Sequence, residues 1–420
     1  MLRLYRLHVP PAFYHRRFRY LWLGLTLSIA GTQMQAWALF WQIRTLTEQP
    51  IALGGVGLAR ILPIVFFSLI GGAVADAVNR RRLLFVTQSV MALGAAVLAW
   101  LTFQGHISLW QIYALTAIQA TAVAFDTPSR QSLVPNLVPA RDLPNAFSLT
   151  SIGFQVGAIA GPALSGLVIA YWGQAYTYLL NSFSYLAVIL ALFLRGPVAQ
   201  QSDPTHRPEV SLSAIREGVR FILSQPIILG TMILDFFATF FSSANTLMPI
   251  VAVDVLGVGV IQYGWLSAAQ AIGATLAALV ISQIDQIRRQ GRVFLLAVVA
   301  FGLATIVFGL ARSFALAMAA LIAIGAADSV SMIIRNTIRQ LQTPDYIRGR
   351  MVSVNQIFFM GGPQLGEIEA GVVAQLFGVP FAIISGGVGA LLAVGWVVRR
   401  WPQLRHYNGD EPVMAQVARD

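Results

Sequence analysis

The 420-residue chain contains no cysteine and no lysine, and it has few charged side chains of any kind. Without cysteine, disulfides and thiol catalysis are excluded. Charged residues make up 11% of the chain, hydrophobic residues make up 57%, and the mean hydropathy is +0.70. Water-soluble globular chains do not reach these values, so the sequence indicates a protein of the lipid bilayer.

Histidine is also scarce, with five residues in the chain, three of them in the terminal tails. The sequence has no paired histidines, no His-Glu metal spacing and no serine nucleophile motif. These absences weigh against a membrane-embedded enzyme, and neither a metal nor a cofactor is expected.

Long apolar runs make up most of the chain. In lipid such runs form helices, because the backbone must satisfy its own hydrogen bonds. A transmembrane barrel is excluded because residues 186–192 are apolar without any alternation. The sequence therefore predicts an all-α polytopic membrane protein with twelve spans. They are residues 20–43, 51–74, 83–103, 107–125, 146–171, 175–194, 227–251, 261–283, 293–311, 314–334, 351–377 and 381–398.

The basic residues, all 28 of them arginine, set the expected orientation. All but Arg44, Arg60 and Arg312 fall in the termini or in alternate loops, so we expect both termini to be cytoplasmic and the first span to be an uncleaved helix. This distribution explains the net charge of +11 without a nucleic-acid partner. The predicted organisation is an N-terminal segment 1–19, a six-helix half 20–194, a linker 195–225 with a surface helix near 210–223, a second half 226–399 and a cytoplasmic tail 400–420.

Several short patterns occur twice, about half a chain length apart. Asp76 followed by an arginine cluster returns at Asp285, and the Arg-Gln-Ser-Leu that begins at Arg130 returns as Arg-Asn-Thr-Ile at Arg335. Repeated halves in a membrane protein indicate a pathway at the interface between them, as in secondary transporters.

The first repeated loop carries a family resemblance. Residues 72–82 read Gly-Ala-Val-Ala-Asp-Ala-Val-Asn-Arg-Arg-Arg. This resembles the loop signature of the major facilitator superfamily, in which the cluster stabilises one end of the alternating-access cycle. Ala77 replaces an expected arginine, and Asn79 replaces a glycine, a mild change if the backbone makes a left-handed turn there. The alternative is a basic loop that only sets topology.

The fifth span resembles the antiporter signature of the same superfamily. Residues 157–166 read Gly-Ala-Ile-Ala-Gly-Pro-Ala-Leu-Ser-Gly, with Gly157, Gly161, Pro162 and Gly166 as the matching positions. The resemblance implies export, whereas the alternative is a packing face of small residues without a coupling role.

Two further segments, residues 125–149 and 362–371, resemble the branch of the superfamily that contains the enterobactin exporter and macrolide efflux proteins. The first begins Phe-Asp-Thr-Pro-Ser-Arg-Gln and contains Leu-Pro-Asn-Ala at residues 143–146. The second reads Gly-Pro-Gln-Leu-Gly-Glu-Ile-Glu-Ala-Gly. That resemblance implies a bacterial inner-membrane protein that exports siderophores, drugs or other amphipathic metabolites, driven by the proton gradient.

Ionisable residues within spans are costly, so each is a candidate functional group. Asp235 begins a polar stripe at helical spacing in the seventh span, which continues through Thr239, Ser242 and Thr246. We expect Asp235 first and Glu367 of the eleventh span second to couple protons, with Glu369 of the same span as a further candidate. A packed, internally hydrogen-bonded stripe is the alternative.

The expected substrate pathway includes aromatic and polar side chains from both halves. Arg60 is a possible partner of Glu367 or Glu369. The full set is Gln33, Trp37, Trp41, Arg60, Gln119, Thr239, Ser242 and Thr246.

The expected cytoplasmic gate consists of repeated acid and arginine positions near the helix ends, in which Asp126 pairs with Arg130 and Asp328 with Arg335. Its residues are Gly72, Asp76, Arg80, Arg81, Asp126, Arg130, Asp285, Arg288, Asp328 and Arg335.

Proton-coupled export of a small molecule by a monomer is the leading functional prediction. Movement of a lysolipid or similar lipid between leaflets, and a non-transporting membrane receptor, stay open as alternatives.

Overall fold

The computed structural model describes residues 10–134, 137–195, 212–242, 244–284, 287–344 and 347–409, and in these ranges the regular structure is helical. The chain divides into two compact units, Met1–Ala38 with Pro63–Pro208, and Leu39–Leu62 with Glu209–Asp420. Residues 39–62, at the end of one helix and the start of the next, thus pack with the second unit.

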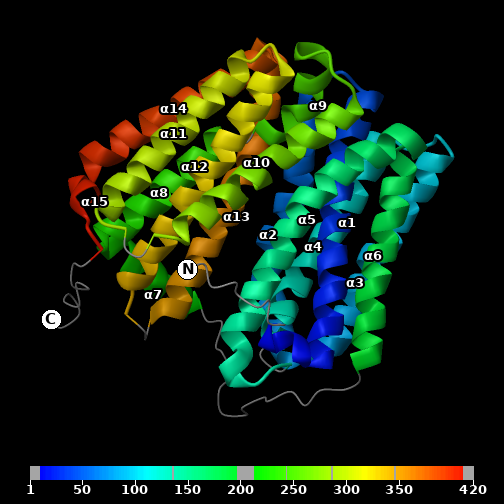
Figure 1. The fold of residues 1–420 in the computed structure, drawn as a ribbon, viewed down its shortest axis with the longest axis horizontal. Coiled ribbons are helices and arrows are strands. Elements are labelled where there is room, and N and C mark those ends of the chain that lie inside the picture. Colours follow the sequence, from blue (N-terminus) through cyan, green and yellow to red (C-terminus); the bar gives the residue numbers. More distant parts are fainter. Residues whose placement is uncertain are drawn as a thin grey trace, which may run out of the picture. The chain divides into compact units, whose positions relative to one another are not determined.

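The first part of the chain, in the described residues, contains two short 3-10 turns and six long helices (Figure 1). They are η1 (Pro11–Tyr14), α1 (Arg16–Leu46), α2 (Pro50–Ala77), α3 (Arg80–Phe103), α4 (Leu109–Leu133), η3 (Ala140–Asp142), α5 (Leu143–Trp172) and α6 (Gln174–Arg195).

The second part begins with a short linker helix and ends with a short tail helix (Figure 1). Its elements are α7 (Leu212–Ser224), α8 (Pro226–Phe241), η4 (Ala244–Leu247), α9 (Met248–Ile250), η5 (Val251–Val255), α10 (Val260–Ile281), α11 (Gln290–Leu310), α12 (Phe314–Leu341), α13 (Arg348–Phe377), α14 (Val379–Arg400) and α15 (Pro402–His406).

The helices have the length and composition that a bilayer requires. In the described ranges, nine segments are both long and apolar enough to cross a membrane. Three more helices, α1, α4 and α13, have 31, 25 and 30 residues, so each is longer than the roughly 20 residues that a span needs. The fold is thus all-α and polytopic, with twelve spans.

Within the first unit, α3 packs between α4 and α6, and α5 packs on α6. A cluster of buried apolar side chains at the arginine-rich end of these helices includes Phe18, Leu84 and Leu192. At the start of α3, Asn79 has φ −64° and ψ 110°, and its side chain accepts hydrogen bonds from the backbone N–H groups of Arg81 and Arg82. Asn79 is therefore an ordinary helix N-cap and does not make a left-handed turn.

Within the second unit, α11 packs between α12 and α14, α10 packs on α12, and α8 packs on α13 and α14. The linker helix α7 confirms the surface helix expected near residues 210–223, and it lies against α13. Its Ile222 is buried with Met232 and Met351, while Arg216 and Arg220 are exposed. Burial of one apolar face and exposure of the other is the pattern of an amphipathic helix.

The seventh span is broken, whereas the sequence predicted one helix over residues 227–251. The helix α8 ends at Phe241, a turn follows at Ser242, and η4, α9 and a π-helical turn (η5) complete the crossing. Pro249 has no backbone N–H for the i−4 hydrogen bond, and Asn245 accepts a hydrogen bond at 2.9 Å from Gln270 Nε2 of α10. The predicted stripe from Asp235 to Thr246 therefore does not lie on one continuous helix.

Part of the expected tail is packed on the second unit. The helix α15 lies against α11 and α8, with Leu404 and Tyr407 buried. Tyr407 O accepts a hydrogen bond from Gly291 N at 3.0 Å, and Gln342 Nε2 lies 3.3 Å from its hydroxyl.

Candidate functional site

A carboxylate of α4 organises the arginine-rich end of the first unit. Asp126 is buried, and its Oδ1 accepts hydrogen bonds from Thr87 Oγ1 at 3.0 Å and Gln88 Nε2 at 2.8 Å. Its Oδ2 is paired with the guanidinium of Arg130, one turn further along the same helix. Asp126 therefore ties α4 to α3 and has all of its charge compensated locally.

The loop signature itself is only partly described. The side chains of Gly72, Asp76 and Arg80 lie outside the described residues, as does the whole of Asp285. Arg81 Nε donates to Leu192 O of α6 at 3.1 Å, and Arg288 is exposed. The gate positions in this loop remain predictions.

The second unit contains a buried ion-pair cluster around Asp235. Arg335 Nη1 lies 3.0 Å from Asp235 Oδ1, and Arg339 Nη2 lies 3.5 Å from Asp235 Oδ2. Asp235 is 4% exposed and both arginines are 2% exposed. One carboxylate of α8 thus faces two cations of α12, in an interior where an uncompensated charge is expensive.

Further polar groups complete this Asp235 cluster. Arg339 Nη1 donates to Asn355 Oδ1 of α13 at 2.6 Å, and its Nε donates to Thr231 Oγ1 of α8 at 3.2 Å. Asp328, whose side chain is 45% exposed, lies 3.5 Å from Arg335. The expected Asp328–Arg335 pair is present, but Arg335 also faces Asp235.

A second pair involves the eleventh span. Arg60 Nη1 of α2 lies 4.0 Å from Glu367 Oε1 of α13, and its guanidinium lies over the Phe40 ring at 5.4 Å. Glu367 Oε2 is buried without a hydrogen-bond partner. A Cβ on Gly57 would lie 2.9 Å from Glu367 Cβ, so only glycine there permits this approach of the two helices.

The other coupling candidate, Glu369, is half-buried. It lies two residues beyond Glu367, about 200° around the helix, so the two carboxylates point to different faces of α13. The structure therefore brings Arg60 to one glutamate and not to the other.

The polar side chains of α1 divide between two environments. Gln35 is buried, donates from Nε2 to Gln119 Oε1 at 2.6 Å and accepts at Oε1 from Asn181 Nδ2 at 2.7 Å. Gln33 and Trp37 are half-buried on another face. Gln119, expected in the substrate pathway, is committed to an amide chain that joins α1, α4 and α6.

In the second unit, Trp41 packs against the buried ring of Tyr263, with the ring centroids 5.0 Å apart. Thr239 Oγ1 donates to the backbone oxygens of Asp235 and Phe236. Ser242 Oγ and Thr246 Oγ1 are buried without a hydrogen-bond partner. The last two hydroxyls keep their capacity to bind a ligand.

The antiporter signature forms a close helix contact. A Cβ on Gly157 would lie 2.6 Å from Ile29 Cγ2, and one on Gly161 would lie 2.6 Å from Ala30 O. Pro162 and Gly166 are buried in α5. The small residues at positions 157 and 161, four apart, therefore let the α5 backbone pack directly against α1, as small-residue motifs do in membrane bundles.

Sequence reasoning missed several members of these clusters, namely Thr231, Arg339 and Asn355 in the second unit and Gln35 and Asn181 in the first. A signal was available for Arg339, because it lies four residues after Arg335 and two arginines on one helix face require an acidic partner. In the described residues, no three His, Asp or Glu side chains gather to hold a metal ion.

Twelve spans, a broken seventh helix and buried charge clusters define a polytopic membrane transporter. The sequence pattern of the family described as transmembrane secretion effectors matches residues 10–414. The chain belongs to this family, within the major facilitator superfamily, and the family consists of transporters rather than enzymes.

Similar proteins extend over nearly the whole chain. The enterobactin exporters EntS of Shigella dysenteriae serotype 1 (strain Sd197) and of Escherichia coli (strain K12) are each 26% identical over 401 residues, 95% of this chain and 95% of theirs. An inward-facing bacterial homologue of the human lysosomal transporter Spinster superposes with a TM-score of 0.72 at 16% identity, over 93% of this chain and 98% of that one. A POT family transporter in complex with 5-aminolevulinic acid has a TM-score of 0.73 at 12% identity, over 93% and 96%. The protein is therefore a multi-pass membrane transporter of an exporter family.

Proposed function

We propose that the protein exports an amphipathic small molecule, such as a siderophore, a drug or a similar metabolite, by alternating access in exchange for protons. The enterobactin exporters that match over 95% of the chain support the substrate class. The arginine distribution supports cytoplasmic termini in a bacterial inner membrane. The protein works as a monomer without a cofactor.

One observation carries the proton coupling, namely the incomplete pairing of Glu367. Its only ion pair among the described residues spans 4.0 Å, and its Oε2 is buried without a hydrogen-bond partner. A buried carboxylate with an unfilled oxygen can take up a proton at small cost, because protonation removes a charge that the surroundings do not compensate fully. Glu367 is therefore our first candidate for the coupling carboxylate.

Asp235 becomes the second candidate, in reverse of the order expected from the sequence. Two buried arginines at 3.0 and 3.5 Å already compensate its charge, and a proton on it would leave both cations without their shared partner. Glu369 is the third, because no described arginine contact supports it.

The pairing of Glu367 also supplies a way to couple the proton to movement. Arg60 and Phe40 belong to the segment 39–62, and Glu367 belongs to α13. A proton on Glu367 weakens the ion pair that joins these segments, so α2 and α13 lose one electrostatic contact. In this proposal, substrate binding at the expected pathway residues, which include Gln33, Trp37, Ser242 and Thr246, competes with that proton.

The gate and the antiporter signature complete the proposal. The pairs Asp126–Arg130 and Asp328–Arg335 each lie within one helix, α4 and α12 respectively. In the proposal they contribute to closing the cytoplasmic side together with the Asp76 and Asp285 loops. The close α1–α5 contact at Gly157 and Gly161 would let α5 move with α1 as one piece.

The coupling is tested in proteoliposomes with an exported compound found by metabolite profiling of cells that lack or overproduce the protein, under iron-replete and iron-starved conditions. We expect Glu367→Gln to abolish exchange driven by a pH gradient while substrate counterflow continues. Glu369→Gln is the comparison variant, because it tests the third candidate, a nearby carboxylate on another face of the same helix. Undiminished proton-driven exchange in Glu367→Gln would contradict the assignment.

A further inference from the structure

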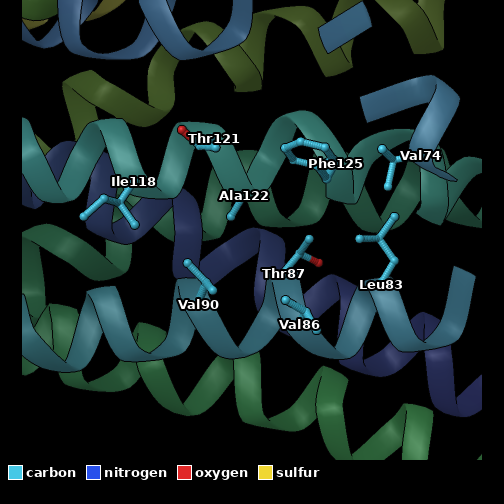
Figure 2. A pocket seen from close by; sticks show the side chains of 9 residues that line it. All are labelled: Val74, Leu83, Val86, Thr87, Val90, Ile118, Thr121, Ala122 and Phe125. Atoms are coloured by element: carbon cyan, nitrogen blue, oxygen red, sulfur yellow. The ribbon is translucent and has the colours of Figure 1, made fainter. Parts of the chain in front are cut away.

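A cleft of about 370 Å³ opens along the arginine-rich half of the first unit, where α2, α3 and α4 meet (Figure 2). One side is formed by Leu83, Val86, Thr87 and Val90 of α3, which recur at helical spacing. Residues of α4 form the other side, and Val74 of α2 lies at the end near Leu83 (Figure 2). Two of its apolar side chains, Val86 and Ile118, are 60% and 49% exposed, as is usual for spanning helices at positions that face lipid.

The described lining residues offer a ligand no uncommitted hydroxyl. Their two hydroxyls already donate hydrogen bonds, Thr87 Oγ1 to Asp126 and Thr121 Oγ1 to the backbone oxygen of Ala117 at 2.9 Å. The other lining side chains are hydrocarbon. A polar solute would lose its own hydrogen bonds there, whereas an acyl chain would lose none.

The volume suits a hydrocarbon chain. An apolar cavity of roughly 150 Å³ already binds benzene and stays free of water. The cleft is more than twice as large, and it is elongated along α3 and α4 (Figure 2). It therefore has room for a stretch of several methylene groups.

A cation, Arg82, lies one helical turn from the cleft, toward the arginine-rich end of α3. Arg82 is exposed, and it precedes Val86 by four residues, so it continues the lining face of α3 by one turn toward the arginine-rich end. A basic residue at the membrane surface attracts anionic lipid headgroups. The cation of Arg82 followed by the apolar cleft thus matches a phospholipid, whose charged headgroup is followed by its acyl chains.

We propose that this cleft binds one acyl chain of an anionic phospholipid, with the phosphate of that lipid at Arg82. The site does not depend on the proposed proton coupling or on the exported compound.

The bound lipid would act on the Asp126 cluster. Thr87 both lines the cleft and donates to Asp126, which is paired with Arg130. An acyl chain against Thr87 and Ala122 would pack on α3 and α4 together, beside this hydrogen bond.

The test uses the full-length protein in nanodiscs that contain photoreactive phosphatidylglycerol or phosphatidylcholine, each with the reactive group on an acyl chain. Crosslinked peptides are mapped by mass spectrometry. We expect labelling on α3 and α4 around the cleft, about fivefold stronger with phosphatidylglycerol, which corresponds to the roughly 1 kcal/mol that one arginine contributes near an anionic surface.

Two kinds of substitution separate the chain from the headgroup. Val86→Trp fills the cleft from its exposed side and should lower labelling by both lipids, and Ile118→Trp does the same from α4 if the first variant fails to fold. Arg82→Gln should remove the preference for phosphatidylglycerol but keep labelling by phosphatidylcholine. Matched controls are Val97→Trp, on α3 outside the cleft, and Arg216→Gln, an exposed arginine of α7.

Three results would overturn the proposal. They are labelling spread evenly over all membrane-facing helices, equal labelling by the two lipids in the wild type, and labelling that neither tryptophan variant lowers.

Discussion

Removal of the Asp235 charge should destabilise the second unit strongly, even though the change to asparagine keeps the side-chain shape. In Asp235→Asn, Arg335 and Arg339 lose a carboxylate at 3.0 and 3.5 Å while both stay 2% exposed. Breaking a buried ion pair by removing one partner costs about 3–5 kcal/mol, because the other charge is left uncompensated.

The remaining contacts of the two arginines place the cost at the lower end. Arg335 keeps Asp328 at 3.5 Å, and Arg339 keeps Asn355 at 2.6 Å. We therefore expect a loss of about 3 kcal/mol. At about 2–4 °C per kcal/mol for a unit of this size, the Tm of the purified protein should fall by about 6–12 °C.

The assay is thermal unfolding of purified protein followed by tryptophan fluorescence, with transport measured in parallel. Asp328→Asn is the control, since that carboxylate is 45% exposed and its loss should cost about 1 kcal/mol or less. The double variant Asp235→Asn with Arg339→Gln removes one cation as well and should recover part of the loss. A Tm for Asp235→Asn equal to that of the wild type, together with a complete loss of proton-driven exchange, would refute the reasoning and make Asp235 the proton carrier.

Three further predictions concern packing and hydrogen bonding. Gly161→Val should separate α5 from α1, because a Cβ there would lie 2.6 Å from Ala30 O; its Tm and transport should both fall, whereas Gly395→Val, with nothing within 4 Å, should retain both. Gln35→Leu should cost about 1–3 kcal/mol for each polar group left unsatisfied, which unfolding measurements on this variant and on Gln33→Leu can compare. Leu404→Ala should cost about 2–5 kcal/mol because the side chain is fully buried, and limited proteolysis should then cleave the chain near α15 sooner than in wild type; unchanged cleavage would contradict the packing of this helix.

Composition and periodicity were sufficient to predict the fold class, because only helices and closed barrels can cross a bilayer. Apolar runs of about 20 residues must be helical, so most span ends were predicted within a few residues. The exceptions are α4 and α12, which continue to Leu133 and Leu341 beyond the predicted ends at residues 125 and 334, and the broken seventh span. The surface helix α7 was also found, since its apolar and polar faces alternate at helical spacing. The loop and antiporter signatures then indicated the superfamily, which the family comparison confirmed.

Local backbone structure was harder to predict where the same residue suits two different backbone conformations. Asn79 suits either a left-handed turn or a helix N-cap, and only the position of the first α3 turn decides for the cap. Just beyond the break after Phe241, Asn245 accepts a hydrogen bond from Gln270 of α10, a contact that follows from how the helices pack. A hydrophobicity pattern contains no information about either.

The sequence by itself determined that the chain crosses a membrane, which residues carry charge inside it, and that its halves repeat. The tertiary structure alone decided how those charges are paired, because pairing depends on which helix faces neighbour each other. Asp235 could not be seen to meet Arg335 and Arg339 until α8 and α12 were placed, nor Glu367 to meet Arg60 before α2 and α13 were placed. A charge in a low-dielectric medium is governed by its neighbours within a few ångströms, and those neighbours are distant in sequence.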